Sequence, residues 1–146
     1  MVTLADLGFK GYYYKIGSWV VPLSLMMIET EESTPIIMLD LDSYNDADGT
    51  LHRTVLDKHG AKFEFSTPPM HIRAKEEFMK KIRSNMINKK ARKIFLEYYN
   101  EETCVYDTGY FYISDFVFKP LFNTPTGPVY DSIRVAFMSY VDNSNV

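Results

Sequence analysis

The stretch AKFEFSTPPMHIRAKEEFMKKIRSNMIN, residues 61–88, decides the fold because it changes from a strand pattern to a helix pattern within a few residues. At its start Phe63 and Phe65 alternate with charged residues. An alternation of period two is typical of a β-strand that buries one face. We therefore predict a strand over residues 61–65.

The second half of the stretch has helical spacing. Its apolar residues recur mostly at intervals of three and four, as Ile72, Phe78, Met79, Ile82 and Met86. The preceding pair Pro68-Pro69 ends the strand, because the residue before a proline is held out of the helical conformation. This pattern predicts one helix over residues 71–88, with an apolar stripe that packs on a sheet.

Most of the remaining chain has the composition of strands. Runs rich in aromatic, β-branched and apolar residues are interrupted by Gly, Pro, Asn and Asp. Turns are expected at 29–33 and 59–60, and loops at 42–49 and 123–128. The predicted strands cover residues 11–16, 19–28, 35–41, 51–56, 61–65, 93–99, 102–106, 109–119 and 130–141.

The fold class that follows is mainly β (α+β): an antiparallel β-sandwich or barrel with one packed α-helix at about residues 71–88. A chain of 146 residues is long enough to bury a core without disulfides, so we expect a single domain over residues 1–146. Aromatic residues make up 15% of the chain, a composition that favours pleated surfaces and protein contacts.

The single cysteine, Cys104, excludes an intramolecular disulfide and a cysteine-rich zinc site. The N-terminal residues lack a basic start followed by an apolar run, and no apolar stretch reaches about 18 residues. We therefore expect a soluble protein, made in the cytoplasm, that does not contact a membrane.

Charge is distributed unevenly along the chain. Residues 71–93 hold nine Lys and Arg against two Glu, whereas the rest holds seven Lys and Arg against 17 acids. On the predicted helix, the side chains expected to face solvent or a partner are Arg73, Lys80, Lys81 and Arg83. The sequence therefore predicts a basic helix face within an acidic body.

Acidic residues gather in the loop that follows the third predicted strand, as Asp40, Asp42, Asp46 and Asp48, with Gly49 at the end. If Gly49 took the sixth position of a helix-loop-helix calcium loop, both end ligands would be missing. We interpret the segment as a solvated loop with a tight reversal at Asp48-Gly49, and a non-standard ion site is the alternative.

No motif of catalysis is present. His52, His59 and His71 lie in no recognised ligand spacing, and Cys104 follows acidic residues, which disfavour a reactive thiolate. Phosphate-binding glycine loops and the Gly-x-Ser-x-Gly signature are absent from the sequence. We expect no enzyme activity, no catalytic residue, no metal and no cofactor.

An aromatic stripe runs through the C-terminal third of the chain. Its members are Tyr106, Tyr110, Phe111, Tyr112, Phe116, Phe118 and Phe122. Such a stripe is a platform for nucleic acid bases in some sheets, but at alternating strand positions aromatic residues more commonly fill a core. We favour the core interpretation.

Two binding functions fit the charge pattern. The basic helix could meet nucleic acid phosphates, although the acidic remainder and a pI near 5.6 disfavour this partner. In a homo-oligomer, the basic face of one copy could instead meet the acidic loop of the next. Complementary patches on one chain favour head-to-tail rings, and we prefer this second function.

Several short motifs resemble small tail-module structural proteins of siphophages and prophages from Gram-positive bacteria. They are Tyr14-Lys15-Ile16 with Pro22, the run DADGTLHR at 46–53, the strand at 62–65 followed by a helix, Val105-Tyr106-Asp107, the run at 109–115 and the final strand at 132–137. The resemblance covers residues 10–141. Residues 85–93 depart from the pattern, so nothing is carried over there.

This resemblance implies a virion structural protein of the tail or baseplate, with a fold similar to that of tail-tube, distal-tail and hub proteins. Its partners would be copies of itself and other virion tail proteins, and it would form a ring or an adaptor. The resemblance assigns subunit contacts to the acidic loop and Arg53. A head–tail connector or stopper, and a nucleic-acid-binding accessory protein that uses the basic helix, are the alternatives.

Overall fold

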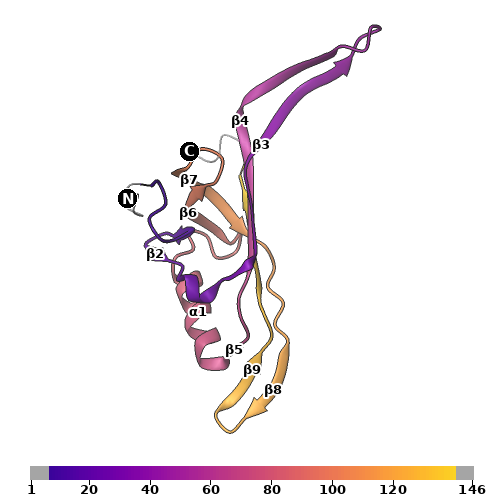
Figure 1. Cartoon of the computed structure of the whole chain (residues 1–146). Helices are drawn as coiled ribbons and strands as arrows, with labels where there is room; N and C mark the ends of the chain where they lie inside the picture. The colour runs from indigo at the N-terminus through magenta and orange to yellow at the C-terminus, as the bar shows by residue number, and fades with distance from the viewer. Residues whose placement is uncertain (1–6, 141–146) are drawn as a thin grey trace.

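The computed structural model describes residues 7–140, and within them it does not describe the side chains of residues 39–43 and 54–58. It is mainly antiparallel β-structure with one α-helix, which confirms the predicted fold class (Figure 1). The elements are β1 (Tyr14–Ile16), β2 (Trp19–Val20), a 3-10 turn (Leu23–Leu25), β3 (Met27–Asn45), β4 (Leu51–Ser66), β5 (Met70–His71), α1 (Ile72–Ser84), β6 (Lys93–Asn100), β7 (Val105–Ile113), β8 (Pro120–Thr124), β9 (Gly127–Tyr130) and β10 (Arg134–Ser139).

Two antiparallel sheets organise these strands. The larger has seven strands in the order β2-β1-β6-β7-β10-β4-β3, and the smaller has three in the order β5-β9-β8. In the larger sheet, β10 comes from the C-terminal part of the chain and lies between β7 and β4. The sheet is therefore complete only when residues far apart in the sequence have paired.

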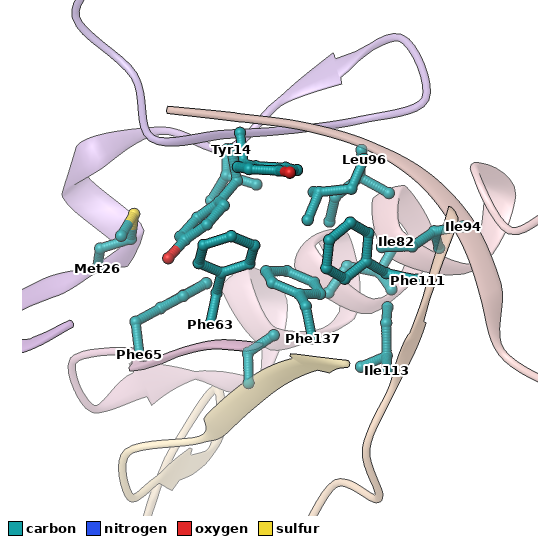
Figure 2. Close-up of a cluster of buried hydrophobic side chains, with 14 of the residues drawn as sticks. Tyr14, Met26, Phe63, Phe65, Ile82, Ile94, Leu96, Phe111, Ile113 and Phe137 are labelled. Carbon is teal, nitrogen blue, oxygen red and sulfur yellow. The ribbon is translucent and has the colours of Figure 1, made fainter. Parts of the chain in front are cut away.

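The larger sheet curls around one hydrophobic core. Three strands separate β1, which holds Tyr14, from β4 in the sheet order, yet the ring centroid of Tyr14 is 5.6 Å from that of Phe63 and 5.7 Å from that of Phe65. It is also 5.2 Å from the ring of Phe137 on β10. Figure 2 shows these rings pointing toward one another from opposite sides of the core. The sheet thus closes partly on itself, as in an open barrel.

Helix α1 fills part of this core from one side. Phe78 and Ile82 are buried, and the ring of Phe78 lies 6.0 Å from that of Trp19. Nδ1 of His71 accepts a hydrogen bond from the backbone N–H of Arg73 at 3.1 Å and so caps the helix N-terminus. The helix ends at Ser84, before the predicted residue 88, because Asn85 leaves the helical conformation, and its side-chain Nδ2 donates to the carbonyl of Lys81 at 2.7 Å.

Two predicted turns lie inside long strands instead. Residues 29–33 belong to β3, which has 19 residues, and residues 59–60 belong to β4, which has 16. Both segments are strand because the ladder of β3 and β4 runs from the pair Met27 and Ser66 to the pair Asn45 and Leu51, with several shifts of register, one of which leaves residues 28–31 without a partner in it. Gly60, for example, lies opposite Ile37 in the ladder.

Other strand boundaries also differ from the prediction. The predicted strand at 19–28 is interrupted by the 3-10 turn after Pro22. Of the two strands predicted within residues 102–119, the structure has one, β7 (Val105–Ile113), which follows a turn and precedes an irregular segment, and β7 ends close to where its pairing with β6 ends. The predicted loop at 123–128 is a hairpin in which β8 and β9 pair, with Gly127 at φ +130°. The predicted strand at 130–141 is divided between the end of β9 and β10.

A partly buried carboxylate links β3 to the core. Glu31 accepts a hydrogen bond from the hydroxyl of Tyr14. Burial raises the pKa of Glu31, and the carboxylates of Glu101 and Glu32 raise it further, while the bond from Tyr14 opposes them. The charged form of Glu31 is therefore less favourable in the folded chain than in the unfolded chain.

We expect Glu31→Gln to stabilise the protein relative to wild type at neutral pH, by up to about 1 kcal/mol since the carboxylate stays partly solvated. Because the folded pKa is raised, the wild-type free energy of unfolding should fall as pH increases above about 4.3, and the variant should lack this slope. Thermal unfolding from pH 4 to pH 8 measures it. Glu29→Gln, an exposed position on the same strand, is the control, and equal slopes in wild type and Glu31→Gln would contradict the assignment.

Candidate functional site: the arm and the basic helix

A two-stranded hairpin extends beyond the body of the protein, and we call its residues 37–60 the arm (Figure 1). Within the described residues, the only part of β4 that pairs with β10 is Lys62–Ser66. Beyond that point, among the strands of residues 7–140, β3 and β4 pair only with each other. Ten residues at about 3.3 Å each make the arm about 30 Å long. Both of its outer edges carry backbone groups that no other strand within residues 7–140 pairs.

The tip of the arm is a tight reversal held by Asp46. Oδ1 of Asp46 accepts hydrogen bonds from the backbone N–H groups of Asp48 and Thr50, both at 3.0 Å. The backbone N–H of Gly49 donates to the carbonyl of Asp46 at 3.0 Å, and Gly49 has φ +83°, a conformation that favours glycine. The predicted reversal at Asp48-Gly49 is confirmed.

Aromatic and ionic contacts order the tip further. Nε2 of His52 lies 2.8 Å from Oδ2 of Asp46, and the ring of Tyr44 stacks on that of His52 at 4.8 Å. The bond from His52, with the backbone bonds from Thr50 and Asp48, lowers the pKa of Asp46. Asp46 therefore keeps its negative charge into acidic solution, and the tip stays acidic.

The predicted subunit-contact residues are brought together in part. Asp46, Asp48 and Gly49 lie at the tip, and Arg53 lies on β4 with Nη2 3.8 Å from Sδ of Met38. The side chains of Asp40 and Asp42 lie outside the described residues. Within the described part of the chain, no group of three or more His, Cys, Asp or Glu could hold a metal ion.

The arm also exposes apolar side chains. Met38 is 60% exposed, Tyr44 59% and Leu51 55%, and Ile37 is exposed as well. Large apolar residues that are gathered on one projecting element, rather than scattered singly, mark a contact surface. Sequence reasoning did not find these residues, because Ile37 and Met38 lie in a run that resembles a core strand.

The predicted basic face of α1 is divided between two hollows. Arg73, Lys80, Lys81 and Arg83 are all exposed. Lys81 lines a pocket of about 220 Å³ with Trp19, Leu25 and Phe78. Lys80 and Arg83 line a different hollow of about 450 Å³ on the other side of the helix. Arg73 lines neither of these two hollows.

Two further cations, missed by the sequence reasoning, stand beside that second hollow. Arg92 donates to Asp115 Oδ1 at 2.9 Å and to the carbonyl of Ser114 at 3.1 Å. Lys75 lies 4.8 Å from the ring centroid of Phe118. The local sequence carries no signal for these contacts, because their partners are 23 and 43 residues away along the chain.

The aromatic stripe does not form a single surface. Phe111 is buried in the core as predicted, and Phe116 packs against the core. Tyr112, Phe118 and Phe122 are exposed, so the core interpretation is wrong for them. Tyr112 lies on the outward face of β7, Phe122 lies on the edge strand β8, and Phe118 lies between these two strands. The alternation of the sequence alone could not indicate that no core covers these positions.

The chain is similar to a protein family and to chains in two solved structures. The model of a family described as "Family of unknown function (DUF6711)" matches residues 5–140. No curated protein sequence matches the chain. Within residues 7–140, no helix is long and apolar enough to cross a membrane.

Two solved structures contain similar chains. One is the tail of an empty GTA particle with C6 symmetry, whose chain is 14% identical, with 90% of this chain and 92% of that chain covered and a TM-score of 0.46. The other is the anti-feeding prophage cap, the AFP tube terminating cap, at 12% identity, with 95% and 90% covered and a TM-score of 0.46.

The tip geometry can be tested directly. We expect Asp46→Ala to speed amide hydrogen exchange at Asp48 and Thr50 by about tenfold, because it removes their shared acceptor. Amides of β10 should be unchanged. Asp48→Ala removes one charge but keeps the acceptor, so it is the matched control. Equal protection in wild type and Asp46→Ala would contradict the assignment.

Proposed function

Because this chain belongs to the DUF6711 family, whose function is unknown, we propose from its own structure that it is a structural subunit of a phage-tail-type assembly, joined to further copies and to other tail proteins through its arm. The single observation that carries this proposal is the arm itself. It is an unsupported two-stranded hairpin about 30 Å long whose side chains include exposed apolar residues.

An isolated two-stranded hairpin is at best marginally stable in water. An arm of this kind gains stability when a neighbour covers its apolar side chains and pairs with its open edges. The exposed residues Met38, Tyr44 and Leu51 supply the apolar area for such a contact. The ordered acidic tip adds charge that can select the partner.

The sequence motifs support the tail in particular. The run at 46–53, part of the resemblance to tail-module proteins, forms the tip and the first residues of β4. A contact between an arm and a different surface of the next copy is heterologous, and such contacts form rings when the rotation closes. We propose a ring or an adaptor in the virion tail on this basis.

Assembly of the purified full chain tests the proposal. We expect sedimentation velocity and negative-stain images to show a defined multimer. Replacing Met38, Tyr44 and Leu51 together by Ser should weaken it by at least about tenfold, because the apolar contact is lost. Alanine at Asp46, Asp48 and Arg53 should weaken it as well. Val105→Ser, which changes an exposed residue on β7, is the control.

A strictly monomeric wild-type protein that is also absent from purified particles by mass spectrometry would refute the proposal. A head–tail connector is the alternative position. Antibodies against the chain that label the neck of the particle, rather than the tail, would favour the connector.

A further inference from the structure

Helix α1 and the segment that follows β7 enclose a groove, which we call the basic groove. It consists of two adjoining hollows, of about 450 Å³ and about 290 Å³. They are continuous because Lys75, Met79 and Arg83 line both. The proposed function does not by itself use this groove.

The groove combines a cationic rim with an apolar floor. Its lining residues include five cations, Lys75, Lys80, Arg83, Lys89 and Arg92, and one acid, Glu76. The apolar part of the lining is Met79, Met86, Phe116 and Phe118. A surface of this composition fits an acidic segment with apolar neighbours.

The cations differ in how far the chain itself neutralises them. Arg92 is paired with Asp115 and lies 5.9 Å from the ring centroid of Phe116, and Lys75 lies over aromatic rings. Within the described residues, Lys80, Arg83 and Lys89 have no carboxylate at ion-pair distance. Their charge is therefore available to a partner.

The arm tip has the complementary chemistry. It presents the exposed carboxylate of Asp48, beside the Asp46 carboxylate that is bonded within the tip, and it exposes Tyr44 and Leu51. Hydrogen bonds already hold the tip in one conformation, so little conformational entropy is lost on binding. If the tip lay in the groove, its acidic side chains would face the cations of the rim, and its apolar side chains would face the apolar floor.

The tip cannot reach the groove of its own chain. Figure 1 shows the arm leaving the body in the direction opposite to α1. We propose that the basic groove receives the arm tip of a second copy of this chain, which makes the contact head-to-tail. This inference rests on the proposed function and names the surface that the arm contacts.

Charge exchange between the two surfaces tests it in the full chain. We expect Lys80→Glu with Arg83→Glu to weaken self-association by at least about tenfold, and Ala47→Lys with Asp48→Lys to do the same, because each places like charges opposite each other. Asp46 is left unchanged so that the turn keeps its acceptor. The chain that carries all four changes should associate as wild type does, since the charges are complementary again.

The matched control is Arg73→Glu with Lys81→Glu, which makes the same charge change on the same helix outside the groove. It should leave association unchanged. Circular dichroism and thermal unfolding confirm that each variant is folded. As a second measurement, Asp48→Cys with Arg83→Cys in a Cys104→Ser chain should form disulfide-linked ladders, whereas Arg73→Cys in place of Arg83→Cys should not.

The outcomes separate this inference from the proposed function. If the wild type assembles and the arm variants dissociate while the groove reversals have no effect, the arm contacts another surface and the groove inference is wrong. Failure of the four-change chain to recover would also overturn it. If Lys80→Glu with Arg83→Glu instead abolishes retention on a double-stranded DNA fragment and leaves association intact, the groove binds nucleic acid and the inference falls.

Discussion

The structure depends on one constraint: the apolar face of a seven-stranded sheet has a single helix to cover it within residues 7–140. An α-helix is about 10 Å wide, whereas seven strands at about 4.8 Å span about 30 Å. The sheet must therefore bury its own face by curling. Tyr14 marks this closure, because its ring contacts Phe63, Phe65 and Phe137 from across the core.

The curl also explains the arm. Curling brings β10 against β4 only where Val135 and Phe137 reach the core, opposite Phe65 and Phe63. Past that segment the two long strands leave the body, and no third strand of residues 7–140 pairs with them. The exposed apolar side chains Met38, Tyr44 and Leu51 of the arm then have no core to enter, and the tip is acidic and ordered. Exposed apolar side chains and open strand edges destabilise a free hairpin, and they stabilise a hairpin that a neighbouring molecule covers.

The two surfaces of opposite charge lie apart for the same reason. Helix α1 is held in the body by Phe78 and Ile82, while the acidic tip lies at the far end of the arm (Figure 1). A molecule with complementary patches at separate ends cannot satisfy them alone. In the proposed assembly, repeated contact between copies satisfies both patches, so the proposal follows from the fold as well as from the charge pattern.

The sequence by itself determined the features that depend on near neighbours: the alternation at Phe63 and Phe65, the helical spacing around Phe78 and Ile82, and the reversal at Asp48-Gly49. Side-chain period and turn chemistry act over a few residues, so they can be read locally. Only the tertiary structure decided the length of β3 and β4 and the position of the groove. Strand length depends on a partner strand, and the groove depends on contacts such as Lys75 with Phe118, which join residues that local pattern cannot connect.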